Sequence, residues 1–194
     1  MSSTELIEVI RTRRAVYPVQ YNSEAISREE IESILEAANW APTHRRTEPW
    51  RFKVFHGEAK RALGVFLAEK YKETTAQYSE FKHKKVLEKS MQSAYVIAIC
   101  MQRDPNESVP EWEEVASTAM AVQNMWLTAH SMRIGSYWSS PVMKDYLGDH
   151  ISLEPGVRCL GFFYLGKYDG ELDPGTRKSP IEEKTTWIEK QNNH

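Results

Sequence analysis

The segment from Trp112 to Met132 constrains the fold most, because its apolar residues are not confined to one stripe of the helix that it predicts. These residues are Trp112, Val115, Ala116, Ala119, Met120, Val122, Met125, Trp126, Leu127, Ala129 and Met132. A helix that is apolar nearly all round must be buried nearly all round. It would be about 30 Å long, and a chain of 194 residues can hardly enclose it alone. Two arrangements stay open: a second subunit covers the helix, which the short chain favours, or the chain's own sheet and flanking helices bury it.

The remaining pattern alternates between helices and strands. Two capping boxes, Ser2 with Glu5 and Ser27 with Glu30, predict helix starts near the N-terminus. Period-two alternation predicts a strand over residues 50–56, and continuous apolar runs predict buried strands over 94–101 and 161–166. Residues 58–90 are charged and helix-rich, but the sequence does not locate a break within them.

Composition excludes several classes of partner. The formal net charge is −2 with 27% charged residues, which argues against nucleic acid or an anionic membrane as the main partner. No apolar stretch approaches the roughly 18 residues needed to span a bilayer, and the N-terminus lacks a signal-like run, so we expect a soluble, cytoplasmic protein. Cys100 and Cys159 lie in apolar runs and are interpreted as small buried hydrophobes. The histidines lack metal-ligand spacing, so no metal site is predicted.

Two pairs of cations are candidate phosphate ligands. Arg13 and Arg14 end the first predicted helix, where they either complement the helix dipole in water or supply planar donors to a phosphate. Arg177 and Lys178 lie in the polar tail and are candidates for the same phosphate. The chain has no P-loop and no GxGxxG motif, so a bound nucleotide must be held by side chains and irregular loops.

Two further segments are candidates for contacts with a flat ring. His44, Arg45 and Arg46 lie in a loop between two prolines, which is either a solvated basic loop or a rim of donors for an electron-rich ring. Trp138 either belongs to the core or flanks the ring, and the hydroxyls of the next two residues are plausible donors.

In their order and spacing, these motifs resemble the nitroreductase family over nearly the whole chain. The match comprises the Arg13-Arg14 element, the loop with Ala41-Pro42 and His44 that closes on Pro49-Trp50, the long apolar helix, residues 135–138, the strand over 161–166, and the Arg177-Lys178 tail. The resemblance implies an α+β fold, a single FMN-binding domain over residues 1–194, and a three-layer α/β/α homodimer. It also implies a central mixed sheet, an extended C-terminal arm and two FMN sites at the subunit interface.

The resemblance assigns roles residue by residue. Arg13, Arg14 and Ala15 fall at the phosphate and ribityl chain of one subunit; Trp40, Thr43, His44 and Arg46 fall where the partner's loop meets the flavin; Trp138, Ser139 and Ser140 fall beside the ring; Arg177 and Lys178 fall at the phosphate. No catalytic side chain is required. Ala15 stands where the family often has Ser, Tyr17 where many members have a basic residue, and Glu48 where Gln is common, which affects FMN affinity more than the fold.

The activity that the resemblance implies is NAD(P)H-dependent, ping-pong reduction of nitroaromatic, quinone or related electron-poor acceptors by FMN. Two alternatives stay open. One is a dimer that binds FMN without turnover, and the other is a flavin enzyme of the same fold with different chemistry, such as dehalogenation or desaturation. The sequence identifies neither the physiological acceptor nor the preferred nicotinamide.

Overall fold

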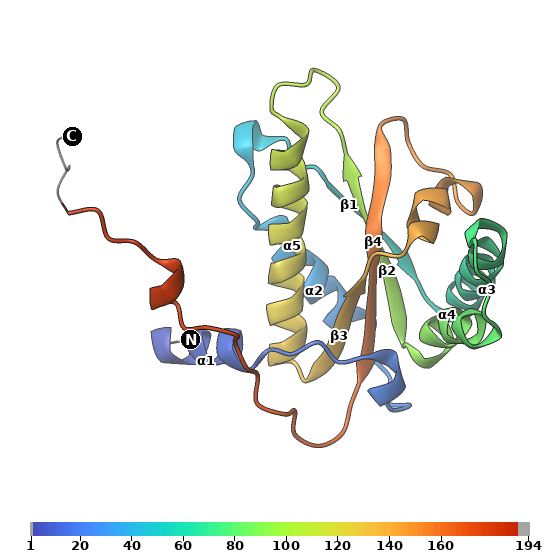
Figure 1. The fold of residues 1–194 in the computed structure, drawn as a ribbon, viewed down its shortest axis with the longest axis horizontal. Coiled ribbons are helices and arrows are strands. Elements are labelled where there is room, and N and C mark those ends of the chain that lie inside the picture. Colours follow the sequence, from blue (N-terminus) through green and yellow to red (C-terminus); the bar gives the residue numbers. More distant parts are fainter. Residues whose placement is uncertain (1, 190–194) are drawn as a thin grey trace.

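The computed structural model describes residues 2–189 and places helices on both faces of one sheet (Figure 1). The strands are β1 (Trp50–Phe55), β2 (Tyr95–Gln102), β3 (Ile134–Ser139) and β4 (Val157–Lys167), in the order β1-β2-β4-β3. The α-helices are α1 (Ser3–Thr12), α2 (Arg28–Asn39), α3 (Gly57–Thr74), α4 (Glu80–Gln92) and α5 (Glu111–Ser131). Short 3-10 helices are η1 (Pro18–Gln20), η2 (His44–Arg46), η3 (Val142–Asp149) and η4 (Glu182–Lys184). The predicted three-layer α/β/α architecture is confirmed.

The sheet separates two apolar cores. On one face, Ile34 of α2 and Val122 and Met125 of α5 pack against Ile97 of the sheet, and all four are fully buried. On the other face, α3 and η3 pack against side chains that alternate with the first set along the strands. The continuous apolar run of β2 therefore supplies both cores in alternation, as expected for a strand covered on both sides.

All three strand pairings in the described part of the chain are antiparallel, so the prediction of a mixed sheet was wrong for this range. The connection between β1 and β2 explains the first pairing. Residues 58–90 form two helices, α3 and α4, and the second returns the chain to the end where β1 finished, so that Phe55 pairs with Val96. A single crossover helix would have produced a parallel neighbour.

The break that the sequence left unplaced lies over residues 75–79. Ser79 caps α4 by accepting a hydrogen bond from the Lys82 amide. The two helices then pack closely, because a Cβ on Gly64 of α3 would lie 2.8 Å from the Cβ of Ser90 on α4. The helical hairpin therefore needs the glycine for close approach.

Both predicted capping boxes are present. Ser2 and Glu5 cap α1, and Ser27 and Glu30 cap α2, each with side-chain and backbone hydrogen bonds in both directions. The two helices nevertheless differ in burial. α2 buries Ile31, Ile34 and Ala38, whereas α1 buries no residue at all and leaves its apolar stripe exposed.

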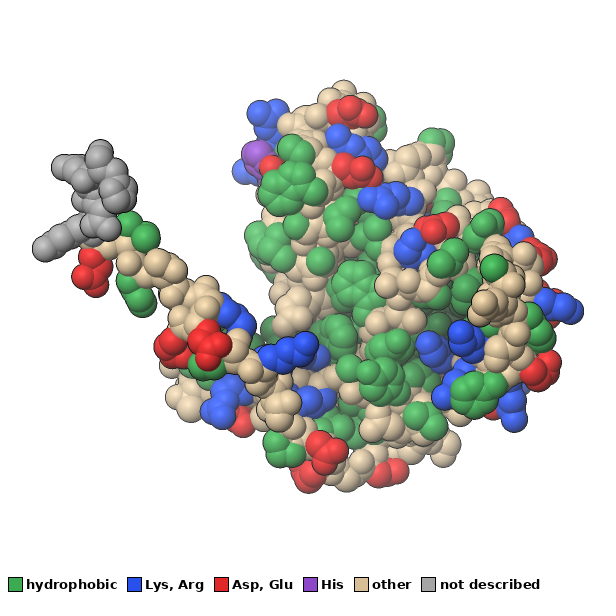
Figure 2. Space-filling model, viewed as in Figure 1, with side chains coloured by type: hydrophobic (Ala, Val, Ile, Leu, Met, Phe, Trp, Pro, Cys, Tyr) green, Lys and Arg blue, Asp and Glu red, His purple; other side chains and the backbone are tan. Residues whose placement is uncertain are grey.

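A C-terminal arm follows β4 and leaves the body of the molecule, passing α1 on its way outward (Figure 1). Its side chains Trp187 and Ile188 are 83% and 79% exposed. Figure 2 shows the arm standing apart from the body, with hydrophobic side chains gathered on the body between the arm and the α3–α4 hairpin. Among residues 2–189, no helix is both long and apolar enough to cross a membrane.

The two cysteines, far apart in sequence, face each other across the sheet. Cys100 on β2 is paired in register with Cys159 on β4, next to an irregularity in the pairing. Both thiols are free and buried. The interpretation as small buried residues is therefore confirmed, and their adjacency is a feature that spacing in the sequence does not reveal.

Candidate functional site

The end of α1 brings Arg13 against the long helix α5. The helix stops at Thr12, and Arg13 takes an extended conformation as its C-cap. The Val16 amide then donates a 3.1 Å hydrogen bond to the Ser136 carbonyl, which fixes the segment along β3. In this position the Arg13 guanidinium lies 4.7 Å from the centre of the Trp126 ring, a cation–π geometry.

Positive charge accumulates around Arg13, and in the described part of the chain no acidic side chain pairs with it. Burial, the charge of Arg14 and the charge of Arg177 all lower the pKa of the Arg13 guanidinium. Arg177 comes from the arm, and although it lies 164 positions away in the sequence, its charge reaches Arg13 in the structure. Within residues 2–189, no carboxylate forms an ion pair with either one. Such a cluster attracts an anion, and planar guanidinium groups suit a phosphate.

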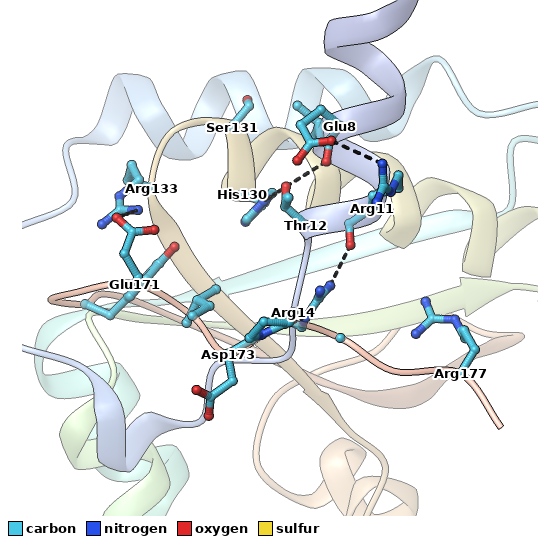
Figure 3. A pocket seen from close by; sticks show the side chains of 15 residues that line it. Glu8, Arg11, Thr12, Arg14, His130, Ser131, Arg133, Glu171, Asp173 and Arg177 are labelled. Atoms are coloured by element: carbon cyan, nitrogen blue, oxygen red, sulfur yellow. Dashed lines mark hydrogen bonds and ion pairs between the residues drawn. The ribbon is translucent and has the colours of Figure 1, made fainter.

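Arg14 points elsewhere. Its Nε donates to the Asp173 carbonyl at 3.1 Å, and its Nη1 donates to the carbonyls of Arg11 and Arg13 at 2.7 Å each. Figure 3 shows Arg14 between α1 and the arm, beside Asp173. The side chain therefore bridges the C-terminal end of α1 and the backbone of the arm, a role that differs from the predicted cofactor contact.

Two tryptophans continue the surface from Arg13 toward β3. Trp126 makes an edge-to-face contact with Phe163 at 5.6 Å, and Trp138 on β3 is paired in register with the same Phe163. Both indoles are partly buried against the core of this face. Trp138 therefore packs on the core and keeps an exposed part, and its contact with a ring stays a prediction.

The other predicted contacts on this side differ in accessibility. Ala15 is partly buried next to Arg14, Ser139 is 8% exposed at the end of β3, and Ser140 is exposed directly after it. Lys178 is exposed on the arm next to Arg177. Of the two hydroxyls, Ser140 is therefore the freer to meet a ligand.

The loop residues predicted for the flavin lie at the opposite end of α5. His44 Nδ1 is 2.5 Å from a carboxylate oxygen of Glu113, in the first turn of that helix. Thr43 accepts a hydrogen bond from the Glu48 amide at 3.2 Å, and the exposed Trp40 indole donates to Glu36 at 2.8 Å.

The backbone of the same loop is strained. Arg45, Arg46 and Glu48 have positive φ angles of 51°, 55° and 42°, which non-glycine residues rarely adopt. Such conformations persist only where the surrounding contacts hold them. The Arg46 side chain is exposed at the tip of this loop.

The two halves of the predicted site do not meet within one chain. Glu113 contacts the loop and Trp126 contacts Arg13, and a helical rise of 1.5 Å per residue puts these two positions about 20 Å apart along α5. One chain therefore supplies a phosphate half at the C-terminal end of α5 and a loop half at its N-terminal end.

A cavity of ≈ 730 Å³ lies beneath the arm, between α1 and the C-terminal end of α5 (Figure 3). Arg14, Arg177 and His130 line it, but Trp138 and Ser139 do not. Acidic and basic side chains alternate around its wall, as in the 3.7 Å pair of Arg133 with Glu171. The cavity therefore lies beside the predicted ring site and separate from it.

Sequence reasoning missed His130, which the structure places close to this cluster. Its Nε2 lies 2.9 Å from the Thr12 hydroxyl. Burial and the charges of Arg13, Arg14 and Arg133 lower the pKa of the imidazole. The only signal in the sequence was its spacing of four residues from Trp126, which puts both side chains on one face of α5.

The structure is that of a layered α+β protein with a cluster of arginine side chains near the end of α1. A model described as the nitroreductase family matches residues 10–167. That match covers most of the chain, and the chain belongs to the nitroreductase family.

Individual relatives agree with this assignment. "Putative NAD(P)H nitroreductase YfhC" of Bacillus subtilis (strain 168) is 27% identical over 191 residues, which cover 93% of each chain. A nitroreductase-like family protein from Bacillus cereus has a TM-score of 0.80 and 26% identity, and the match covers 98% of this chain and 99% of that one. A "putative nitroreductase in complex with FMN" from Desulfovibrio desulfuricans has a TM-score of 0.73 at 22% identity, with 98% and 100% covered, a likeness of fold.

Proposed function

We propose that the chain is an FMN-dependent oxidoreductase that uses NAD(P)H to reduce nitroaromatic, quinone or related electron-poor acceptors. Family membership and the NAD(P)H nitroreductase name of the YfhC relative support the reaction class. The FMN complex of the Desulfovibrio desulfuricans neighbour supports the cofactor. The observation that carries the proposal is the Arg13 guanidinium, held 4.7 Å from the centre of the Trp126 ring and reached by the charge of Arg177. Among residues 2–189, no carboxylate forms an ion pair with either arginine.

The residues of this cluster fit the cofactor's phosphate. Arg13 is held by the end of α1 and by the face of Trp126, so its guanidinium is oriented before a ligand arrives. A phosphate dianion would supply the negative charge that the cluster lacks, and charge-assisted hydrogen bonds from guanidinium groups are the strong ones. Arg13 and Arg177 are assigned to the phosphate, with Lys178 next to them on the arm.

The ring is assigned to the surface beside β3. The exposed part of Trp138 offers an apolar face, and the Ser140 hydroxyl offers a donor at the end of the strand. FMN, when bound, would supply the hydride and electron-transfer chemistry of a ping-pong cycle between NAD(P)H and the acceptor. The chain's own side chains bind and orient, and no protein acid or base is assigned.

The proposal includes a homodimer. The loop half and the phosphate half lie about 20 Å apart on α5, so one chain alone does not complete a site. A second chain with its α5 running the opposite way would bring its Thr43–Arg46 loop to the first chain's Arg13. The exposed Trp112 and Met120 on α5, and Leu6, Ile7 and Ile10 on α1, are apolar surface for such a contact.

An anaerobic titration tests the function. Purified protein reconstituted with FMN should show the yellow flavin absorbance, lose it on addition of NADH or NADPH, and recover it on addition of a nitroaromatic or quinone. If the protein retains FMN but neither nicotinamide bleaches it, the chain is an FMN-binding protein or a flavin enzyme with a different reaction. Protein that does not retain FMN would exclude the flavin function altogether.

A further inference from the structure

Two side chains from connecting segments, Asn22 and Arg133, fasten the first residues of the arm to the body. Asn22 donates to the Asp169 carboxylate at 2.9 Å. Arg133, directly after α5, donates to the Gly170 carbonyl at 2.8 Å. These contacts set where the arm starts, but they lie seven or more residues before Arg177, which is too far to determine where its guanidinium comes to rest.

The last attachment before Arg177 is Arg14. Its guanidinium donates to the Asp173 carbonyl and, on the other side, to two carbonyls at the end of α1. These carbonyls lack helical partners, so the cation there also complements the helix dipole. The guanidinium therefore holds two backbone segments that are far apart in sequence.

Gly175 allows the arm to approach this closely. A Cβ on that residue would lie 2.3 Å from Cζ and 2.5 Å from Nη2 of Arg14, far inside contact distance. The guanidinium thus lies directly against the backbone of the arm, two residues before Arg177. A side chain at position 175 would displace the guanidinium of Arg14 from its place against the arm.

We propose that Arg14 is a positioning residue, which holds the arm at Asp173 and Gly175 so that Arg177 lies beside Arg13. The inference rests on the proposed FMN function, because the phosphate is what Arg13 and Arg177 would then share. Arg14 touches the arm and α1 with its donors, and its effect on the phosphate is exerted through Arg177.

Double-variant cycles on FMN affinity test the proposal. Arg177→Ala removes one charge-assisted contact of about 1.5–3 kcal/mol, or about ten- to a hundredfold in affinity. Arg14→Ala and Gly175→Ala should each weaken FMN binding by about tenfold in the native background, and by less than about twofold when Arg177 is already Ala. Equal losses in both backgrounds would show that Arg14 acts independently of Arg177 and would overturn the proposal.

Gly175→Ala carries the argument, because it changes no charge. If Arg14→Ala weakens binding and Gly175→Ala does not, Arg14 acts as a distant positive charge and the positioning role is wrong. Gly148→Ala is the matched control, since its nearest new contact is 3.9 Å away, and it should leave FMN affinity unchanged. Riboflavin, which lacks the phosphate, should bind all variants alike.

Trypsin supplies a readout without FMN. Arg177 and Lys178 are exposed, but trypsin needs several residues before the cleaved bond in a free, extended conformation, and these include the attached Asp173 and Gly175. Apo Arg14→Ala and Gly175→Ala should therefore be cut about tenfold faster than the native protein, at unchanged melting temperature. Unchanged cleavage rates would contradict the attachment itself. If the native protein does not bind FMN but Arg14→Ala is still cut faster by trypsin, the proposed function is wrong and the attachment of the arm by Arg14 stands.

Discussion

Arg13 is the residue on which phosphate binding is expected to depend most. It combines a fixed backbone position at the end of α1, a partly buried guanidinium over Trp126 and a second cation from the arm. Replacing it with Ala should weaken FMN binding about ten- to a hundredfold, the value of a hydrogen bond to a charged group. Isothermal or fluorescence titration with FMN and with riboflavin measures the effect, and riboflavin affinity should hardly change.

Arg11→Ala is the control for that experiment. It removes the same charge from the same helix, but Arg11 is exposed and its 3.8 Å partner is Glu8 on the helix surface. If Arg13→Ala lowered FMN and riboflavin affinity equally, Arg13 would be a structural residue at the helix end. The loss of its cation–π contact, worth about 0.5–1 kcal/mol at a partly exposed site, should appear as a small drop in melting temperature.

His130 should make stability depend on pH. Burial and three neighbouring guanidiniums lower its pKa in the folded protein, so the unfolded chain takes up the proton at higher pH than the folded chain does. The free energy of unfolding should therefore fall as the pH drops below about 6.5, the ordinary value for histidine. Urea unfolding between about pH 7.5 and 5.5 measures the slope.

The comparison with His130→Gln isolates this residue. Burial also lowers the pKa of His150, which contributes to the pH dependence of the unfolding free energy in the native protein and in His130→Gln alike. The difference between the two pH dependences is therefore due to His130. Identical slopes would show that the imidazole does not titrate against the neighbouring cations. Saturating phosphate-bearing ligand should flatten the native slope, because added negative charge favours the protonated ring.

At the scale of the element, α5 divides into a face for its own chain and a face left open. Met125 is fully buried in the core between α5 and the sheet, whereas Met120 is 39% exposed on the same helix. Met125→Lys should unfold the chain, because an unpaired buried charge costs several kcal/mol. Met120→Lys should leave a folded chain that no longer dimerises.

Light scattering and circular dichroism separate the two outcomes. The native protein at micromolar concentration should have twice the chain mass of 22.5 kDa. Met120→Lys should have the mass of one chain with a native-like spectrum. A native protein that is already monomeric would contradict the proposed interface, and a dimeric Met120→Lys would place the interface on another surface.

The elements were predictable where local signals are strong. Capping boxes at Ser2 and Ser27 begin α1 and α2 as expected, and the continuous apolar run over 94–101 is the buried strand β2. The break before α4 was not predictable, because Ser79 is a weak start signal within a charged, helix-rich stretch. The relative direction of neighbouring strands was not predictable either, because it depends on whether one or two helices connect them.

The membership of the candidate site stays a prediction, but the structure adds the geometry that the sequence could not give. The sequence analysis predicted that Arg13 and Arg177 serve one phosphate. In the structure the arm passes α1, and the charge of Arg177 acts on Arg13. The family resemblance placed Arg14 at the cofactor, whereas in the structure its side chain donates to the backbone of the arm. In an extended segment, adjacent side chains such as those of Arg13 and Arg14 point to opposite sides. The sequence did not show that the segment after α1 is extended, so it did not predict this divergence.

At the scale of the whole molecule, the chain leaves much apolar surface without a neighbour. The arm exposes Trp187 and Ile188, α1 exposes its apolar stripe, and α5 exposes Trp112. Exposed apolar patches on soluble proteins often mark interaction surfaces. The proposed dimer accounts for all of them together, and it makes stability depend on protein concentration.

The placement of the two half-sites at opposite ends of α5 has a consequence for mixed populations of chains. In the proposed dimer, every site takes its phosphate half from one chain and its loop half from the other. A chain defective at Arg13 and a chain defective in the Thr43–Arg46 loop would each be inactive alone. Paired together, they would build one site from two intact halves and one from two damaged halves. Two inactive alleles expressed in one cell would therefore restore about half of the activity in each mixed dimer, by complementation between copies of the same gene.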